Sequence, residues 1–343
     1  MKAVGIEKHG DLDELRVMDV PEPQAARGEV VVKLHAAGMN HLDIWIRKGG
    51  RGVIPMPHIL GSDGAGVVAA VGPDVRLLRE GDEVMIYPGL WCGRCPQCES
   101  GQQSECVDFG NVGVTVPGTF AQKIALPERN CFRKPAYLTW TEAAALPVAY
   151  LTAWRMLTGR ARLAPGETVL IHGIGGGVAV ASLQLAKRIG AEVVVTSSSD
   201  EKLAKARVLG ADHAVNYAKS ADVAKTILEV LHGSRVDVVV DTVGAATWPV
   251  GPQVLRKGGR MVACGVTTGA SALVDVQAVY WNQLTIMGST LGSVTEFRQL
   301  LRACQAWQFR PLIDSTFPLA QAREAQGKME KGQQFGKIVL TME

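Results

Sequence analysis

The sequence lacks any stretch of about 18 uncharged apolar residues, which is the length that a helix needs to cross a membrane. It also lacks a block of like charge, because 36 basic residues are mixed with 33 acidic ones and the net charge is only +3. These absences argue against a membrane span and against a basic surface for nucleic acid. The first ten residues, MKAVGIEKHG, have no apolar signal core. We therefore expect a cytoplasmic protein whose cysteines are thiols or metal ligands, not disulfides.

The pattern of apolar and polar residues changes once along the chain. At 343 residues, the chain can build more than one hydrophobic core. Up to about Pro127, short β-like segments such as EVVVKLHAAG and GAGVVAAVG are separated by Gly and Pro. From about Pro135, apolar runs such as ETVLIHG and VDVVVDTV alternate with helical segments such as SLQLAKRIG. That alternation is typical of a parallel sheet covered on both faces. We predict an α/β protein with a β-rich domain and a doubly wound parallel-sheet domain.

Four of the seven cysteines lie in one short segment, CGRCPQCESGQQSEC. Thiolates at this spacing can surround one Zn²⁺ and leave no open coordination position for a reactive water. Four unliganded thiols and an iron-sulfur cluster are the alternatives. The glycines and the proline between the cysteines supply the tight turns that a metal lobe needs. We predict a structural zinc lobe over about residues 91–107, with the ligands Cys92, Cys95, Cys98 and Cys106.

A glycine-rich turn follows the apolar run VLIH and precedes a helical segment. Gly173, Gly176 and Ala179 have the spacing GxxGxxA, in which the first glycine permits the turn and the alanine allows close helix packing. Gly176 and Gly177 would let the backbone approach a pyrophosphate at the start of the helix. A plain tight turn is the alternative. The strand before the turn, the helix after it and the next strand, AEVVVTSS, favour a dinucleotide site.

The end of that next strand should decide the choice of cofactor, because an acidic residue there would bind the adenosine ribose of NAD. This chain has Thr196, Ser197 and Ser198 at this place, with Lys202 one helical turn further on. Hydroxyls and a lysine suit a 2′-phosphate, so NADP(H) is favoured over NAD(H). Asp200 keeps the alternative open, in which Lys202 is a solvated helix residue.

Together with the segments GSDGAGVVAAVG and LPVAYLTAW, these motifs resemble the medium-chain dehydrogenase/reductase superfamily over essentially the whole chain. The resemblance implies a GroES-like catalytic domain made of residues 1–128 and 292–343. It also implies an inserted Rossmann domain at 129–291, with the active site between the two. The four cysteines match the structural zinc ligands of the zinc alcohol dehydrogenases one by one.

The catalytic zinc site of those alcohol dehydrogenases is not matched. Their pattern of Cys, His, a hydroxyl residue and Asp appears here as NHLD, so Asn40 replaces a cysteine ligand and Leu42 the hydroxyl. Their Gly-His-Glu appears as Gly61, Ser62 and Asp63, and the segment PVAYLTAW offers no third-ligand cysteine. An amide, a hydroxyl and one carboxylate make a poor zinc site, so we expect no catalytic zinc.

The same positions resemble the zinc-independent quinone and enone reductases, most of which lack the cysteine lobe. We predict catalytic roles for Asn40, as the polar group facing substrate or nicotinamide, and for Asp43, which would orient Asn40 or pair with Arg47. Tyr150 is a further hydrogen-bond donor for developing enolate charge. Core or salt-bridge roles are the alternatives for Asp43 and Tyr150. His41 is interpreted as a surface or packing residue.

The resemblance also implies cofactor contacts outside the glycine turn. Lys202 and Tyr217 would contact the 2′-phosphate and the adenine. The remaining positions would line the cofactor channel or flank the nicotinamide: Thr152, Val178, Val243, Gly244, Gly265, Val266 and Thr267. Each of these residues could instead be an ordinary turn residue at the end of a strand, without a role in cofactor binding.

The leading hypothesis is an NADPH-dependent reductase of conjugated carbonyls, such as enones, alkenals and enoyl thioesters, or of quinones. An alcohol dehydrogenase with an unconventional catalytic zinc site is the second, and a noncatalytic NADPH-binding sensor or zinc-knuckle interaction module is the third. The partner is expected to be a small-molecule substrate. The resemblance implies that two subunits pair through the last Rossmann strand, and the apolar run LTIMGST would otherwise be an exposed sheet edge, so a homodimer or homotetramer is also expected.

Overall fold

The computed structural model describes residues 1–50 and 54–342, and the chain divides into two compact units. Unit 1 comprises Met1–Leu151 and Gly292–Glu343, and unit 2 comprises Thr152–Leu291. In the part of the chain that the structure describes, no helix is long and apolar enough to cross a membrane.

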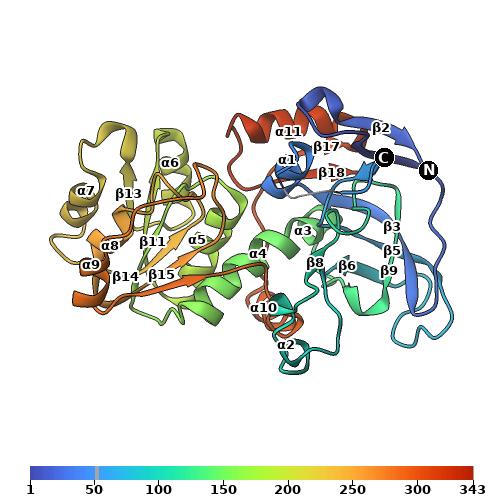
Figure 1. The fold of residues 1–343 in the computed structure, drawn as a ribbon, viewed down its shortest axis with the longest axis horizontal. Coiled ribbons are helices and arrows are strands. Elements are labelled where there is room, and N and C mark those ends of the chain that lie inside the picture. Colours follow the sequence, from blue (N-terminus) through green and yellow to red (C-terminus); the bar gives the residue numbers. More distant parts are fainter. Residues whose placement is uncertain (51–53, 343) are drawn as a thin grey trace. The chain divides into compact units, whose positions relative to one another are not determined.

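Unit 1 is built on strands from both ends of the chain (Figure 1), which pair antiparallel except for the parallel pair β17 and β18. A seven-stranded sheet has the order β10-β6-β5-β3-β18-β17, with β9 also paired to β3, and smaller sheets join β2-β1-β4 and β7-β8. The strands are β1 (Lys2–Ile6), β2 (Arg16–Asp19), β3 (Glu29–Gly38), β4 (His58–Ile59), β5 (Ala65–Val71), β6 (Glu83–Ile86), β7 (Gly89–Leu90), β8 (Gly110–Asn111), β9 (Lys123–Pro127), β10 (Cys131–Arg133), β17 (Ile313–Pro318) and β18 (Lys337–Thr341). Because the C-terminal strand β18 pairs with β3, the two ends of the chain complete one domain.

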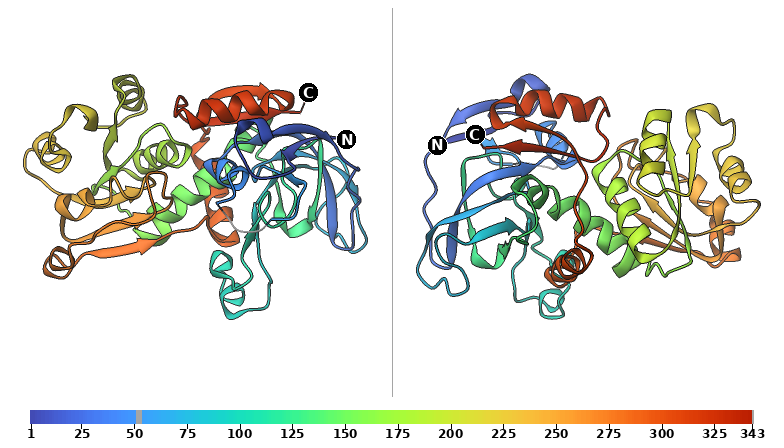
Figure 2. Two further views of the ribbon diagram at one scale, coloured as in Figure 1. Left: turned by 45° about the horizontal axis from the view of Figure 1, so that its top comes forward. Right: turned by 180° about the vertical axis from the view of Figure 1, so that it is seen from behind.

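Short helices cover this sheet or connect its strands. They are α1 (His41–Arg47), α2 (Pro96–Glu99), α3 (Trp140–Ala145), α4 (Pro147–Trp154), α10 (Val294–Trp307) and α11 (Ala322–Glu330). Helix α11, red in Figure 2, packs on β17 and β18. Helix α10 begins with a capping box, in which the Ser293 side chain accepts from the Glu296 N–H and the Glu296 carboxylate accepts from the Ser293 N–H.

One predicted domain boundary is corrected. Residues 129–151, assigned from the sequence to the dinucleotide-binding domain, belong to unit 1. Strand β10 pairs with β6 in the sheet of unit 1, and α3 packs on β3. The prediction placed the boundary where helical patterns begin, but the first of those helices covers the β-rich domain.

Unit 2 is a six-stranded, wholly parallel sheet with the order β13-β12-β11-β14-β15-β16. Its strands are β11 (Thr168–Ile171), β12 (Glu192–Ser197), β13 (His213–Asn216), β14 (Val236–Asp241), β15 (Leu255–Ala263) and β16 (Thr285–Gly288). The central strands are valine-rich runs buried on both faces, as a parallel sheet covered by helices requires. The predicted α/β class and doubly wound sheet are therefore confirmed.

The helices of unit 2 are α5 (Gly177–Ile189), α6 (Asp200–Val208), α7 (Val223–Val230), α8 (Val250–Val254) and α9 (Val276–Trp281). Leu170 of β11 belongs to a core that includes Ile227 of α7, whereas Val169 and Ile171 point to the opposite face and are equally buried. Helix α5 ends at Gly190, which adopts a left-handed φ of 96°.

Candidate functional site

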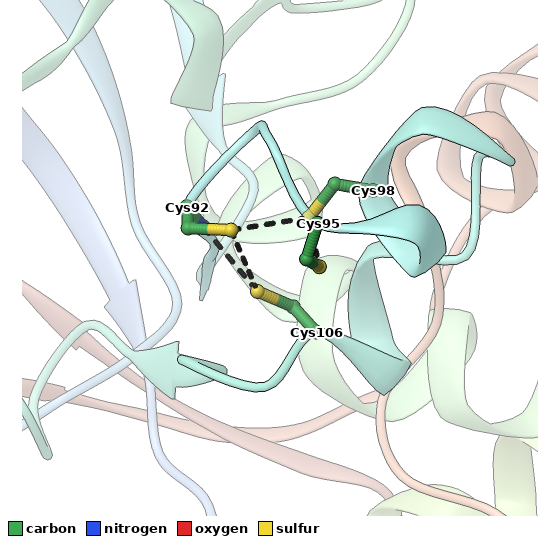
Figure 3. Close-up of side chains that lie close together, drawn as sticks. All are labelled: Cys92, Cys95, Cys98 and Cys106. Atoms are coloured by element: carbon green, nitrogen blue, oxygen red, sulfur yellow. Dashed lines mark hydrogen bonds between the residues drawn. The ribbon is translucent and has the colours of Figure 1, made fainter.

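The four predicted metal ligands lie together on one loop of unit 1 (Figure 3). Their sulfur atoms are all within 4.8 Å of one another. The separations are 3.5 Å for Cys95 and Cys98, 3.5 Å for Cys92 and Cys106, and 3.9 Å for Cys92 and Cys98. Because α2 begins directly after Cys95, backbone N–H groups point at its sulfur, and the Cys98 N–H lowers the pKa of Cys95 to about 6.

This sulfur cluster fits a single zinc ion. Four ligands at about 2.3 Å from a tetrahedral Zn²⁺ are about 3.8 Å from one another, close to the separations observed here. A cluster of several iron atoms would force the sulfurs further apart. Burial raises the pKa of Cys98 to about 12, so a bound cation is needed for all four cysteines to be thiolates together. All four positions of the metal would be filled by protein, so the lobe would be structural.

The cysteine lobe is tied to the rest of unit 1 by polar contacts. Arg129 Nη2 donates to the Trp91 carbonyl at 2.7 Å, and the Arg129 guanidinium lies over the Trp91 ring. The Val294 N–H, in the first turn of α10, donates to Gln103 Oε1 at 3.3 Å. Loss of the metal would therefore loosen contacts that hold α10 and β7.

A second group of polar side chains lies buried within unit 1, and we call Asn40, Asp63 and Lys337 the polar cluster. Lys337 on β18 is 2% exposed, Asp63 is fully buried and Asn40 is 8% exposed. Lys337 Nζ donates to Asn40 Oδ1 at 2.6 Å and to Asp63 Oδ2 at 3.0 Å. Asn40 Nδ2 donates to the same Asp63 oxygen at 2.8 Å. The cluster joins the end of β3, the segment before β5, and β18.

Asp43 orients the backbone of Asn40 from the first turn of α1. Its Oδ2 accepts from the Asn40 N–H at 2.7 Å, and its Oδ1 accepts from the Gly61 N–H at 3.2 Å. The alternative pairing of Asp43 with Arg47 is corrected, because the Arg47 guanidinium donates to Glu330 and Gln326, each at 2.5 Å. Burial raises the pKa of Asp43 to about 7, against the lowering effect of the two N–H groups and of the Lys337 charge.

The raised pKa of Asp43 predicts a dependence of stability on pH. Between the usual pKa of 3.8 and the folded value of about 7, the folded state holds the proton more tightly than the unfolded chain does, so this group makes the protein less stable as pH rises. Asp43→Asn removes the titration. In urea unfolding, the stability of wild type relative to this variant should fall between pH 5 and pH 8, by at most about 3 kcal/mol. The exposed control Asp74→Asn should show no such change, and a flat difference for Asp43→Asn would mean that Asp43 is ionised throughout.

The other predicted polar residues of unit 1 occupy different settings. Tyr150 on α4 is fully buried, its hydroxyl accepts from the Leu312 N–H at 2.8 Å, and its ring packs edge-on against Phe309. That placement favours the core role for Tyr150. His41 is exposed at the start of α1 and contacts Trp45, as a packing residue would. Ser62 is buried and donates to the Val112 carbonyl at 2.7 Å.

The polar cluster does not fit a catalytic zinc. Its side chains offer an amide, a carboxylate and an ammonium. The ammonium already binds the two oxygen atoms, Asn40 Oδ1 and Asp63 Oδ2, that could have served as metal ligands. Zinc prefers thiolate and imidazole ligands. Among residues 1–50 and 54–342, the cysteine lobe is the group of Cys, His, Asp and Glu residues close enough together to hold a metal.

In unit 2, the predicted glycine turn joins β11 to α5. Gly173 has a left-handed φ of 68°, and a Cβ atom there would lie 2.7 Å from a methyl group of Val243. Gly176 is the N-cap of α5, and Gly177 and Val178 form its first turn. The first N–H groups of the helix therefore have no intrahelical partner and can bind a pyrophosphate, as the motif predicts.

The carboxyl end of β12 carries the residues predicted to select the cofactor. Ser197 is buried and Ser198 is exposed. Lys202 lies close to the glycine turn, since a Cβ atom at position 175 would be 3.0 Å from Lys202 Nζ. The Asp200 carboxylate accepts from Asn216 Nδ2 at 2.7 Å and from Lys219 Nζ at 2.5 Å. Both partners lie at or beyond the end of β13, so the Asp200 carboxylate is directed toward that strand and is paired with a lysine.

The remaining cofactor candidates follow the carboxyl ends of neighbouring strands, where ligands of open parallel sheets bind. The Asp241 carboxylate at the end of β14 accepts from the N–H groups of Val243 and Gly244, at 2.8 and 2.9 Å. The Thr267 hydroxyl donates to the Val243 carbonyl at 3.3 Å. The other candidates are placed as follows: Gly265 and Val266 after β15, Tyr217 after β13, and Thr152 on α4.

The sequence analysis missed three contributors. Lys337 is almost 300 residues from Asn40 along the chain, and no local pattern marks it. Asp241 holds the loop of Val243, and its place at the end of a valine-rich strand was a usable signal. Gly175, at a φ of 126°, lies within the same glycine-rich turn but outside the GxxGxxA spacing.

Comparisons with known proteins match both units. Residues 26–136 match the alcohol dehydrogenase GroES-like domain, and residues 177–306 match the zinc-binding dehydrogenase family. A zinc-type alcohol dehydrogenase-like protein of Schizosaccharomyces pombe is 33% identical, over 96% of each chain. The solved structure of an NAD-dependent alcohol dehydrogenase is 40% identical over all of both chains, with a TM-score of 0.96.

A further solved structure, a crotonyl-CoA carboxylase/reductase in complex with NADP, is 27% identical, with a TM-score of 0.92 over 99% of this chain and 94% of its own. The relatives thus include alcohol dehydrogenases and a crotonyl-CoA carboxylase/reductase. With both of its domains matched, this chain belongs to the medium-chain dehydrogenase/reductase superfamily of NAD(P)H-dependent oxidoreductases, in the branch of zinc-type alcohol dehydrogenase-like proteins.

Proposed function

We propose that this enzyme uses NADPH to reduce a conjugated carbonyl compound, such as an enone, alkenal or enoyl thioester, or a quinone, without a catalytic metal. The polar cluster is the observation that carries the proposal. Lys337 donates to Asn40, which stands where the zinc alcohol dehydrogenases that this chain resembles have a cysteine ligand, and to Asp63, which follows the position of their histidine ligand. Apart from the cysteine lobe, residues 1–50 and 54–342 bring together no group of Cys, His, Asp and Glu that could hold a Lewis-acidic metal, which argues against a metal-dependent alcohol dehydrogenation.

Reduction of a conjugated carbonyl can proceed with the groups that are present. A bound reduced nicotinamide supplies a hydride to the β-carbon, the electron pair of the double bond moves to the carbonyl oxygen as an enolate, and solvent supplies the proton at the α-carbon. Asn40 would donate a hydrogen bond to the oxygen on which this charge develops. Asp43 would keep the backbone of Asn40 in place.

Alcohol dehydrogenation is the second candidate, favoured by the names of two of the relatives. A screen separates the two functions. NADPH oxidation is followed with alkenals, enones, enoyl thioesters and quinones, and NADP⁺ or NAD⁺ reduction is followed with primary and secondary alcohols. We expect turnover of at least one conjugated acceptor and none of the saturated alcohols. Alcohol oxidation without reduction of any conjugated acceptor would overturn the proposal, and nucleotide binding with no turnover would favour a sensor.

We also propose that NADPH is preferred over NADH. Ser197, Ser198 and Lys202 offer donors and a positive charge to a 2′-phosphate. The carboxylate that could instead have bound the ribose hydroxyls, Asp200, is paired with Lys219. The relatives include one named for NAD and one solved with NADP, so titration with both cofactors is the relevant test.

A homodimer formed through unit 2 is a further proposal. Strand β16 is the edge of the six-stranded sheet, and the helix before it exposes large apolar residues: Val276 is 69%, Tyr280 63% and Trp281 65% exposed. A second copy of the chain could pair with this edge and cover these side chains. Light scattering at micromolar concentration should give twice the chain mass or a multiple of it.

Variants can locate the interface of that dimer. Trp281→Asp should shift the mass toward a single chain, because burying a new carboxylate in the interface is unfavourable. The control Val208→Asp, at an 88% exposed position on α6, should not change the mass. A monomeric wild type would refute the proposal.

A further inference from the structure

The ammonium group of Lys337 has no hydrogen-bonding capacity left to share. It carries three donors and no acceptor. Its three partners are the Met39 carbonyl at 2.7 Å, Asn40 Oδ1 at 2.6 Å and Asp63 Oδ2 at 3.0 Å. Because the side chain is 2% exposed, solvent cannot replace these partners without opening the structure.

This arrangement sets the orientation of the Asn40 side chain. An ammonium can only donate, so it selects the amide oxygen, and the Asp63 oxygen that already accepts from Lys337 selects the amide nitrogen. The 180° flip of the amide would bring two donors together at Lys337 and two acceptors together at Asp63. Lys337 and Asp63 therefore fix both ends of the Asn40 amide.

One hydrogen of the Asn40 amide remains weakly held. The first is directed at Asp63 Oδ2 at 2.8 Å, whereas the second has the Gly38 carbonyl at 3.5 Å, the limit of a hydrogen bond. Asp63 is itself fixed, because its Oδ1 accepts from the Val148 N–H at 2.7 Å, in the first turn of α4. The second hydrogen is thus available to a stronger acceptor, and its direction depends on the cluster.

From this geometry we infer that Lys337 is a positioning residue for the hydride-transfer reaction, which holds the Asn40 amide so that one N–H is presented to the oxygen of the substrate. The inference rests on the proposed role of Asn40 as donor. It assigns Lys337 no direct contact with substrate or cofactor. Its effect on the reaction should therefore pass through Asn40.

A double-mutant cycle tests whether the effect of Lys337 on the reaction rate depends on Asn40. The variants are Asn40→Ala, Lys337→Met and the combination of both, assayed on whichever reaction the substrate screen identifies. Each single change should lower kcat by about 100-fold, as loss of one preorganised donor does. The double variant should be no more than about 3-fold slower than Asn40→Ala, because the group that Lys337 positions is already gone. The KM for the nicotinamide cofactor should change little in all three.

Lys337→Met leaves a buried carboxylate without its counter-ion, so its folding is measured first by near-ultraviolet circular dichroism and zinc content. If it does not fold, Lys337→Arg replaces it in the cycle, since arginine keeps the charge but its planar fork cannot reach the same three oxygens. Losses that multiply in the double variant, or full kcat in either folded Lys337 variant, would overturn the inference. If the enzyme oxidises alcohols and the losses in the cycle are not additive for that reaction, the proposed substrate class is wrong but the positioning role of Lys337 is supported.

Discussion

Replacing Lys202 with alanine should weaken NADPH binding by about 10- to 100-fold and leave NADH binding nearly unchanged. A charge-assisted hydrogen bond contributes about 1.5–3 kcal/mol, and about 1.4 kcal/mol corresponds to a factor of ten in a dissociation constant. The 2′-phosphate is the group that distinguishes the two cofactors, so a bond to it should affect NADPH alone. Titration of wild type and Lys202→Ala with both cofactors, followed by nicotinamide fluorescence, measures the four dissociation constants.

Lys205→Ala is the matched control, because this lysine lies on the same helix and its charge is paired with Glu201 at 2.6 Å. It should change neither affinity by more than about 2-fold. Equal losses of NADPH and NADH in Lys202→Ala would place its ammonium, which lies close to the glycine turn, on the pyrophosphate shared by both cofactors. A wild-type preference for NADH would mean that Asp200 leaves Lys219 to bind the ribose hydroxyls.

Cys98→Ser should release the metal from the cysteine lobe and destabilise unit 1. The lobe holds β7 and the start of α10, so its loss should cost about 3 kcal/mol or more. For a domain of about 200 residues, that corresponds to a fall in Tm of about 6–12 °C. Scanning calorimetry and zinc quantification of the purified variant measure both effects.

Cofactor affinity should survive the loss of the metal. The residues proposed to bind the nicotinamide cofactor lie in unit 2, whereas the cysteine lobe lies in unit 1. The folded fraction of Cys98→Ser should therefore bind NADPH almost as wild type does. Cys131→Ser, which removes a buried thiol of unit 1 outside the lobe, should keep the zinc. Loss of hydride transfer in well-folded, zinc-free Cys98→Ser would assign the metal to the chemistry instead.

The features that the sequence predicts well are those encoded within a short segment. The four cysteines lie within fifteen residues, so a short segment is enough to bring their sulfur atoms close enough together to hold one ion. The glycine turn is equally local, because the strand before it and the helix after it fix its direction. The valine-rich strands predict the parallel sheet for the same reason.

The polar cluster could not be predicted in this way. Asn40, Asp63 and Lys337 come from the end of β3, the segment before β5, and β18, and they meet only because β3 pairs with both β5 and β18. Asn40 drew attention because it replaces a cysteine ligand, and Asp63 because it follows Ser62 at the position of a histidine ligand, but Lys337 lies in an ordinary strand sequence, GKIVL. The predicted domain boundary was wrong for a related reason, since the helical pattern of α3 does not reveal which sheet the helix covers.

The central claim is that hydride transfer proceeds with a structural metal and no catalytic one, and the zinc stoichiometry of the active enzyme tests it most directly. Zinc is quantified by mass spectrometry after dialysis against a weak chelator, and turnover of the best substrate is measured on the same sample. The account predicts about one zinc per chain and turnover that does not increase when zinc is added. Two tightly bound zinc ions per chain, or turnover that rises in proportion to a second equivalent of zinc, would contradict it.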